Sequence, residues 1–301
     1  MTGHLIITTA FNYAADRLKP FLRSAAKHCP NADILLFADR DDSEFLDAIA
    51  AYNGRTRVVV PKGYKPGLDL YTKMALRRSI KTIRPDNLQR LFPSVMERQF
   101  IRTRLYAPLH MKFKRFGWAN AFLQDADPKP GKVLLSDSRD VFFQGDPFTD
   151  PRAGLVCGEE PLKIGESSFN AKVIEYTYSQ RLLDKLSDLP VLCSGVVIGS
   201  CDNILAYTDG MISEILEIPL RLFGRTFGDQ AVHNKLLHST KTLPFETSKN
   251  GDGFIATLHD SDLKEFSFDE TMGLLTKDGR PVTVVHQYDR HEGLAAWVWG
   301  Q

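Results

Sequence analysis

The fold is set by two apolar runs near the start of the chain, Leu5-Ile6-Ile7-Thr8-Thr9-Ala10 and Asp33-Ile34-Leu35-Leu36-Phe37-Ala38. Both are rich in aliphatic and β-branched residues, as expected for parallel strands that are buried on both faces. Helical spacing in 16–28 and 43–52 and a third strand in 57–60 complete a β-α-β-α-β order within sixty residues. That order predicts an α/β fold with a mostly parallel sheet flanked by helices.

The rest of the chain continues the alternation of strands and helices. Segment 70–122 is mostly helical by pattern, 132–135 and 141–143 are short strands, and 173–189 has the spacing of one amphipathic helix. Further strands are expected at 154–157, 191–199, 254–258 and 281–285, and further helices at 204–216 and 230–237. We find no repeat and no linker, which predicts one domain over 1–301, with a nucleotide-sugar-binding half (about 1–150) and an acceptor half (about 151–301).

Composition narrows the choice of partners. Lys and Arg together number 38 against 37 Asp and Glu, so no global positive field favours nucleic acid. The four cysteines lack the short paired spacing of a zinc site, and we interpret them as buried thiols of a protein in a reducing compartment. There is no apolar run of transmembrane length, so the expected location is the cytoplasm. A basic helical stripe leaves open a peripheral contact with the inner face of a membrane; it consists of Lys73, Arg77, Lys81 and Arg84.

The main chemical anomaly lies in Val133-Leu134-Leu135-Ser136-Asp137-Ser138-Arg139-Asp140-Val141-Phe142-Phe143, where charged residues interrupt an apolar strand. Buried charges are costly unless they are compensated. Ligands of open α/β sheets bind at the carboxyl ends of strands, where carboxylates can hold a divalent cation that bridges phosphates. The alternative is a structural ion pair of Asp137 or Asp140 with Arg139.

The longer segment Leu134-Leu135-Ser136-Asp137-Ser138-Arg139-Asp140-Val141-Phe142-Phe143-Gln144-Gly145-Asp146-Pro147-Phe148 resembles the DxD region of GT-A-fold glycosyltransferases, in particular family-8-like enzymes. The resemblance aligns the second metal-binding Asp of that motif with Asp140. The first falls on Ser138, so this chain has a D-x-R-D variant in which Asp137 is the alternative ligand.

Three later segments carry the same resemblance in the same order. The run 192–199 is similar to the strand near which the donor sugar lies, and it places Ser194 and Gly195 there. The run 228–238 is similar to the family's DQ helix, which implies that Asp229 and Gln230 face the donor sugar; Asp229 as a simple helix N-cap is the competing interpretation. The run 284–291 resembles the C-terminal histidine segment, which implies that His286 completes the metal shell, with a hydrogen-bonded structural histidine as the alternative.

The resemblance therefore implies a set of site residues. The expected metal is Mn²⁺ (or Mg²⁺), held by Asp137, Asp140 and His286. Asp229 and Gln230 are the expected catalytic residues. Arg104 precedes Pro108 as in the family's R-L-x-x-P helix and is expected to clamp the diphosphate. The residues expected to contact the donor are Thr8, Ala10, Asn12, Asp39, Arg104, Ser138, Ser194 and Gly195.

These features predict a metal-dependent glycosyltransferase that moves a sugar from a nucleoside-diphosphate sugar to a glycan, lipid-linked or protein acceptor, with retention at the anomeric carbon, as in polysaccharide biosynthesis. Two alternatives stay open. A nucleotide- or glycan-binding pseudoenzyme is suggested by Ser138. A sugar-phosphate nucleotidyltransferase shares the fold type, but the first strand here leads into 8–12 without a glycine-rich phosphate loop.

Overall fold

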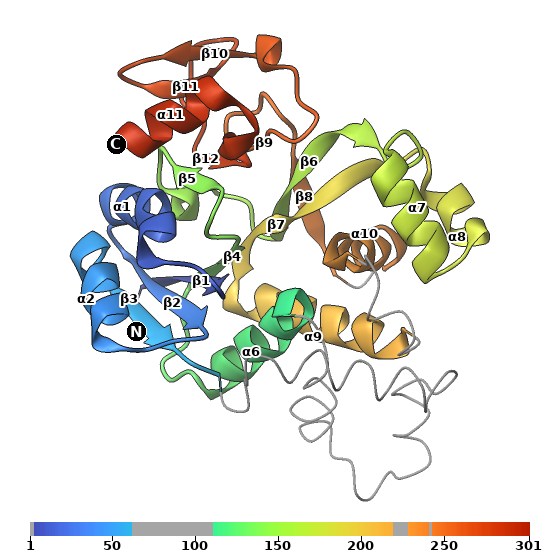
Figure 1. Ribbon diagram of the computed structural model, residues 1–301. Coiled ribbons are helices and arrows are strands. Elements are labelled where there is room, and N and C mark those ends of the chain that lie inside the picture. Colours follow the sequence, from blue (N-terminus) through green and yellow to red (C-terminus); the bar gives the residue numbers. More distant parts are fainter. Residues whose placement is uncertain (1–2, 62–110, 219–227, 241–242) are drawn as a thin grey trace, which may run out of the picture.

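A seven-stranded sheet lies at the centre of the molecule (Figure 1). The computed structural model describes residues 3–61, 111–218, 228–240 and 243–301. The strand order is β3-β2-β1-β4-β7-β6-β8. Four neighbouring pairs are parallel, and only β7 runs antiparallel to both of its neighbours. The strands are β1 (His4–Ala10), β2 (Ala32–Ala38), β3 (Thr56–Val59), β4 (Lys132–Ser136), β6 (Leu155–Lys163), β7 (Pro190–Ser200) and β8 (Phe245–Ser248).

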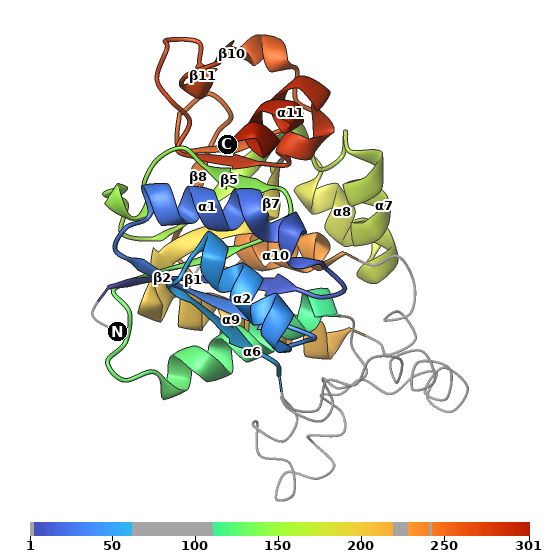
Figure 2. The ribbon, with the colours of Figure 1, turned by 60° about the vertical axis from the view of Figure 1, so that its left-hand side comes forward.

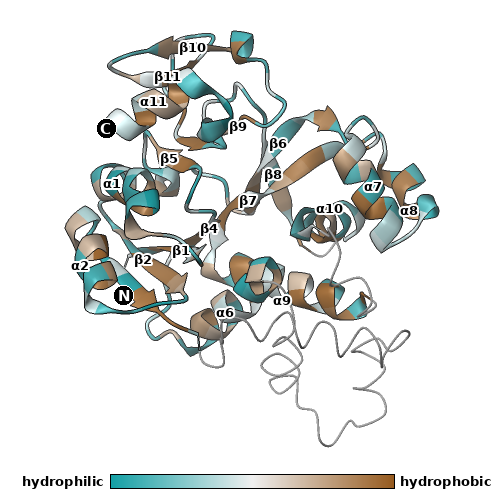
Figure 3. Cartoon of the chain, in the orientation of Figure 1, coloured by the Kyte–Doolittle hydropathy of each residue, from teal (hydrophilic) through white to brown (hydrophobic). Residues whose placement is uncertain are grey.

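Helices cover both faces of this sheet, which explains the apolar runs of its strands (Figures 1 and 2). Leu5 and Ile7 of β1 belong to the core cluster beneath α6 (Met111–Asp125) and α9 (Cys201–Glu217). Ile6, between them, points to the opposite face and packs in the cluster formed with α1 (Lys19–His28) and α2 (Ser43–Tyr52). Successive side chains of a strand face opposite ways, so a strand covered on both sides must be apolar at every position. The hydropathy colouring shows the same apolar strands between helices of mixed polarity (Figure 3).

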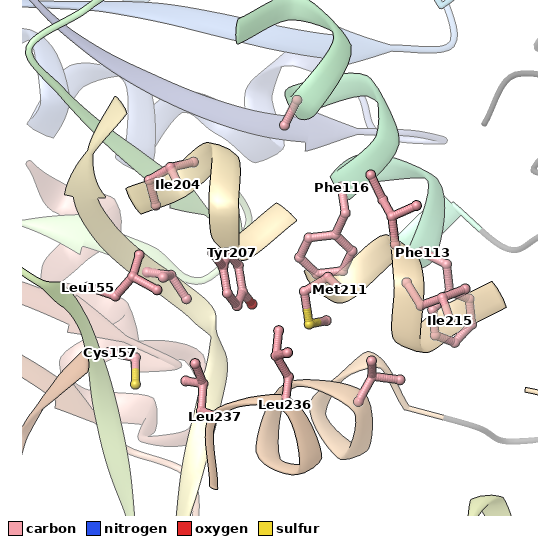
Figure 4. Packing of buried hydrophobic residues seen from close by; sticks show 14 of the residues in the cluster. Phe113, Phe116, Leu155, Cys157, Ile204, Tyr207, Met211, Ile215, Leu236 and Leu237 are labelled. Atoms are coloured by element: carbon pink, nitrogen blue, oxygen red, sulfur yellow. The ribbon is translucent and has the colours of Figure 1, made fainter. Parts of the chain in front are cut away.

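The core on the α6 side includes α10 (Asp229–Ser239), which packs against α9 and β7. Figure 4 shows Tyr207 of α9 between Phe116 of α6 and Leu236 and Leu237 of α10. The rings of Phe116 and Tyr207 meet edge to face at 6.0 Å. This packing fixes the position of α10 relative to α9 and the sheet.

A second, three-stranded sheet joins β5 (Val141–Phe143), β12 (Val284–His286) and β9 (Ile255–Thr257) in that order. β5 and β12 are antiparallel, and His286 is the partner of Val141. The Gln287 N–H donates to the Asp140 carbonyl at 2.6 Å. The register of this small sheet therefore places a histidine from the end of the chain beside the acidic segment that follows β4.

The C-terminal part also contains elements that the sequence patterns do not reveal. They are the hairpin β10 (Phe266–Asp269) and β11 (Gly273–Thr276), the helix α11 (Glu292–Gly300) and the edge strand β8. Short 3-10 turns occupy Ala15–Leu18, Pro147–Thr149, Leu263–Glu265 and Tyr288–Arg290. The expected strand at 281–285 forms only in Val284–His286, whereas the strand expected at 154–157 extends to Lys163.

The single amphipathic helix predicted for 173–189 is wrong. Two helices occupy this region, α7 (Ser168–Thr177) and α8 (Gln180–Leu186). Ser179 separates them because its extended backbone and its side chain, which accepts from the Leu182 N–H, form the N-cap of α8. A serine N-cap competes with continuation of the preceding helix.

Three further expectations concern the cysteines, a membrane-spanning helix and the basic stripe. All four cysteines are free and buried, as predicted. In the described parts of the chain, no helix has both the length and the apolar character needed to cross a membrane. The basic stripe at 73–84 and most of the predicted helical segment 70–122 lie outside the described residues, and the part that is described contains α6.

Candidate active site

Asp137, Asp140 and His286 lie together where β4 ends and β5 begins. One ligand atom of each can be chosen so that the three lie within 4.8 Å of one another. The Asp137 N–H donates to the Gly195 carbonyl at 2.8 Å, which ties the acidic segment to β7, while β12 carries His286 in from the other side. Two antiparallel registers thus assemble the three residues that were expected to bind a metal.

Each of the two carboxylates has one oxygen on an arginine and the other facing His286. Asp137 Oδ1 accepts from Arg115 Nη1 at 2.5 Å, and Asp137 Oδ2 lies 3.8 Å from His286 Nε2. Asp140 Oδ2 accepts from Arg139 Nη2 at 3.3 Å, and Asp140 Oδ1 lies 4.0 Å from the same imidazole nitrogen. The ion pair of Asp140 with Arg139, the alternative that the sequence suggested, is therefore present. In each of the two carboxylates, one oxygen remains directed at the imidazole.

His286 is buried at 2% exposure, and its Nε2 has no hydrogen-bond partner among the residues that the structure describes. Distances of 3.8 and 4.0 Å are too long for hydrogen bonds to the two carboxylates. A buried nitrogen without a partner costs about 1–3 kcal/mol. Two carboxylate oxygens and one imidazole nitrogen suit Mn²⁺ or Mg²⁺, so the residues present fit a divalent cation. Asp137 is 41% exposed, which leaves the group open to solvent on that side.

Gly195 provides the space for His286. A Cβ at this position would lie 2.3 Å from His286 Cε1, 2.6 Å from Nε2 and 3.0 Å from Asp137 Oδ2. Any side chain on Gly195 would occupy the region between these two residues. Its neighbour Ser194 contributes its carbonyl oxygen, which accepts from Arg115 Nη2 at 3.0 Å.

Arg115, on α6, is a site residue that the sequence patterns did not identify. Its guanidinium bridges Asp137 and Asp229, with Nη2 at 2.8 Å from Asp229 Oδ2, and its side chain is only 16% exposed. Burial opposes the charge, but the carboxylates of Asp229 and Asp137 outweigh it and raise the pKa of Arg115. No spacing signal marks it in Lys112-Phe113-Lys114-Arg115-Phe116. Arg104, the arginine that was expected to serve the donor site, lies outside the described residues.

Asp229 and Gln230 occupy the first turn of α10. The N-cap is Gly228, which makes no side-chain cap, so the interpretation of Asp229 as the N-cap is wrong; its carboxylate pairs with Arg115 instead. Gln230 Nε2 donates to Glu160 Oε1 at 2.9 Å and to Asn170 Oδ1 at 3.1 Å. Burial raises the pKa of Glu160 to about 7. Glu160 was also missed, since Gly158-Glu159-Glu160-Pro161 has the pattern of a surface loop.

Ser138 points away from the metal-site group. Its hydroxyl donates to the Thr9 carbonyl at 2.8 Å, and the residue is only 3% exposed. Asp137, and not Ser138, joins Asp140 and His286 in the three-residue group, and the backbone bends at 138–140.

The residues expected to bind the nucleoside lie at the ends of β1 and β2, whose register pairs Ala10 with Ala38. Asn12 has a left-handed backbone (φ 59°), and its N–H donates to Asp39 Oδ2 at 3.0 Å. Ala10 is buried in the α1 side of the core. Thr8 is buried beside Arg115 in a cavity of about 20 Å³, and its hydroxyl has no partner in the described part of the chain. The structure thus brings Asn12 and Asp39 together and places Thr8 beneath Arg115.

A larger cavity, of about 320 Å³, lies elsewhere in the described part of the molecule. α1, β5 and α11 enclose it, with Arg23, Lys27 and Trp297 among its lining residues. None of the residues expected at the active site lines it. The group of Asp137, Asp140 and His286 is therefore identified by its residue types and not by the size of a cavity.

Fold and site together define an α/β protein with a carboxylate-rich group at the carboxyl end of its central strand β4. No protein-family model matches the chain, and no curated protein matches it. Among the solved structures that match is the galactosyltransferase LgtC, described in complex with donor and acceptor sugar analogues. The TM-score is 0.51 at 14% identity, over 98% of this chain and 95% of that chain. This likeness confirms the predicted GT-A-like α/β fold, and at this identity it shows the fold alone.

Proposed function

We propose that the chain is a metal-dependent glycosyltransferase that uses a nucleoside-diphosphate sugar as its donor. The observation that carries this proposal is the group of Asp137, Asp140 and His286, with the unpartnered Nε2 of His286 facing a free oxygen of each carboxylate. The fold shared with a galactosyltransferase supports the same reaction class. We further propose one catalytic domain, with the donor half in about 1–150 and the acceptor half in about 151–301.

In this proposal Asp137 Oδ2, Asp140 Oδ1 and His286 Nε2 hold Mn²⁺ or Mg²⁺. When bound, such a cation acts as a Lewis acid that neutralises charge on a leaving diphosphate. Arg139 pairs with Asp140 and Arg115 pairs with Asp137, and Arg115 also fixes Asp229 relative to Asp137. Because the guanidinium holds both carboxylates, the cation-binding group and the start of α10 keep a constant separation.

The donor sugar is proposed to lie between the metal-site group and the first turn of α10. Asp229 and Gln230 are then the residues that contact the sugar, and Ser194 and Gly195 form the wall beneath it. Asn12 and Asp39 are proposed to contact the nucleoside. Transfer with retention, to a glycan, lipid-linked or protein acceptor, belongs to the same proposal.

The test is ligand-induced stabilisation followed by turnover. We expect Mn²⁺ together with UDP, GDP, CDP or ADP to raise Tm, since a ligand that binds only the folded state stabilises it. Asp140→Ala and His286→Ala should each abolish the shift. Asp289→Asn is the matched control, because Asp289 pairs with Arg139 but does not belong to the three-residue group. No shift with any of the four nucleotides would contradict the proposal.

A second candidate function is a nucleotide- or glycan-binding pseudoenzyme. The observation in its favour is that Ser138, which aligns with the first Asp of the DxD motif, is uncharged and donates its hydroxyl hydrogen to the Thr9 carbonyl. A screen of nucleotide sugars for Mn²⁺-dependent hydrolysis separates the two. Hydrolysis of one donor supports the transferase and identifies the base and sugar, whereas a Tm shift without any turnover supports the pseudoenzyme.

A further inference from the structure

Cys193 of β7 contacts the imidazole of His286 at Nδ1, whereas the two carboxylates face Nε2. Its Sγ is 3.4 Å from His286 Nδ1, which is hydrogen-bonding distance for sulfur. Cys193 is buried at 2% exposure, and the thiol also hydrogen-bonds the carboxyl of Glu160. An ordinary cysteine is a neutral thiol at pH 7, since its usual pKa is about 8.5. A neutral thiol has one proton to donate and lone pairs to accept.

Besides the backbone N–H of Gly195, the thiol contacts two side chains, and these favour one nitrogen of His286 as the proton carrier. An ionised Glu160 can only accept, so the S–H is donated to it and the sulfur is left to accept from an Nδ1–H group. Nε2 then has a free lone pair directed at the gap between Asp137 and Asp140. In the opposite arrangement Nδ1 accepts the S–H, so Glu160 loses that donor, and Nε2 carries hydrogen. Among the described residues this Nε2–H has no acceptor within hydrogen-bonding distance, since the carboxylate oxygens lie at 3.8 and 4.0 Å. The first arrangement satisfies every group except the lone pair that a cation would use.

The contacts continue beyond Glu160 toward α10. Glu160 Oε1 accepts from Gln230 Nε2 at 2.9 Å, and Gln230 adjoins Asp229 in the first turn of that helix. A continuous line of hydrogen bonds therefore runs from Gln230 through Glu160 and Cys193 to the imidazole of His286.

We propose that Cys193 is a positioning residue that fixes His286 in the Nδ1–H tautomer and so prepares Nε2 to bind a cation, with Glu160 holding the thiol proton. The proposal rests on the metal site of the proposed function. Residues that accept a hydrogen bond from the second nitrogen of a metal-binding histidine set its orientation and tautomer, and their loss lowers metal affinity about 10- to 100-fold. In this chain a thiol takes the place that a carboxylate or carbonyl usually has.

The test measures the tautomer and the metal affinity separately. Two-bond ¹H–¹⁵N correlation spectra of the metal-free protein, with the His286 signals assigned from His286→Gln, should show Nδ1 protonated in the wild type. Cys193→Ala should lose this preference and weaken Mn²⁺ binding, followed by the EPR signal of free Mn²⁺, about 10- to 100-fold. Cys193→Ser retains a donor and an acceptor, and it should nearly restore both readouts.

The controls separate this role from simple packing. Cys157→Ala also removes a buried thiol, but Cys157 is not a partner of His286, so Mn²⁺ affinity should stay at the wild-type value. Glu160→Ala should shift the tautomer through Cys193, whereas Glu159→Ala, whose carboxylate pairs with Thr247, should not. Mn²⁺ affinity and tautomer both unchanged in Cys193→Ala would overturn the proposal. Absence of Mn²⁺ binding in the wild type would instead contradict the proposed function, and the metal-free spectra would still decide the tautomer.

Discussion

Gly195 matters because the absence of a side chain leaves the space that His286 occupies. We expect Gly195→Ala to displace the imidazole, since the new Cβ would lie 2.3 Å from Cε1. Overpacking of this kind costs about 1–3 kcal/mol of folding free energy. The expected result is a folded protein that has lost its Mn²⁺-dependent Tm shift.

The matched control for this variant is Gly199→Ala on the same strand. A Cβ there would lie 3.0 Å from Leu155 Cδ2 and 3.3 Å from Asn203 Cβ, which is a milder crowding against side chains away from the site. Gly199→Ala should therefore lower Tm but keep the Mn²⁺ effect. Equal retention of Mn²⁺ binding by both variants would show that Gly195 does not shape the metal site.

His233 gives a prediction about acid stability. Burial lowers the pKa of His233 to about 3, and its Nδ1 lies 2.8 Å from the Tyr207 hydroxyl. Between pH 6.5 and about 3 the unfolded chain binds a proton that the folded protein does not, so this group's contribution to stability is lost as the pH falls through that window.

We therefore compare the wild type with His233→Gln by urea unfolding between pH 7 and 4. The variant should be less stable at pH 7, and the difference should shrink by up to about 1.4 kcal/mol per pH unit below pH 6.5. Glu160, with its pKa raised to about 7, has the opposite sign: its contribution falls as the pH rises from 4.5 to 7. It is present in both proteins and cancels in the difference. A difference independent of pH would contradict the assignment.

At the level of residues, the chemical types of the site were predictable and their partners were not. Asp137 and Asp140 stand out as charges within an apolar strand, and His286 follows a β-branched run. These three residues lie together because of the registers of β7 and β12, which cannot be predicted from a local sequence pattern. The sequence did not identify Arg115 and Glu160 as site residues, because a charged residue in a helix or beside a turn usually faces solvent. Their burial becomes visible only once α6 and β6 are in place.

Among the elements, α6 has the most direct effect on the site, because it delivers Arg115 between the end of β4 and the start of α10. Removal of one partner of a buried ion pair typically costs about 3–5 kcal/mol. Arg115→Met should cost an amount at the lower end of this range, because Asp229 is 15% exposed and would lose its cation, whereas water would screen Asp137, which is 41% exposed. The measurement is the free energy of unfolding in urea.

Lys235→Met is the comparison for that measurement. Lys235 pairs with Glu214 across α9 and α10, but both side chains are 21% exposed and the lysine holds a single carboxylate. Its loss should cost about 1 kcal/mol or less. A cost of Arg115→Met no larger than this would show that the bridge does not hold the two elements together.

The elements themselves were predictable where a single strong pattern governs them. β1, β2, α1, α2 and β7 follow from apolar runs and helical spacing. The break between α7 and α8 was missed because the capping role of Ser179 depends on its backbone conformation, not on hydrophobic periodicity. β8, β10 and β11 are four-residue edge or hairpin strands, whose patterns are too short to distinguish from loops.

At the scale of the whole molecule, the number of ligands at the site predicts coupling between metal and nucleotide. Asp137, Asp140 and His286 offer a divalent cation three ligand atoms. A cation such as Mg²⁺ takes six ligands in octahedral geometry, and substrate phosphates commonly supply several of them. Mn²⁺ should therefore bind weakly to the free protein and more tightly in the presence of the matching nucleotide. Such coupling is commonly about 5- to 150-fold, and by linkage the nucleotide must gain the same factor from Mn²⁺.

The measurement of this coupling is a pair of titrations: Mn²⁺ with and without UDP, GDP, CDP or ADP, and the nucleotide with and without Mn²⁺. The corresponding nucleosides, which lack the diphosphate, should leave Mn²⁺ affinity unchanged. Equal Mn²⁺ affinity with and without all four nucleotides would show that a diphosphate does not complete the coordination of the cation at this site.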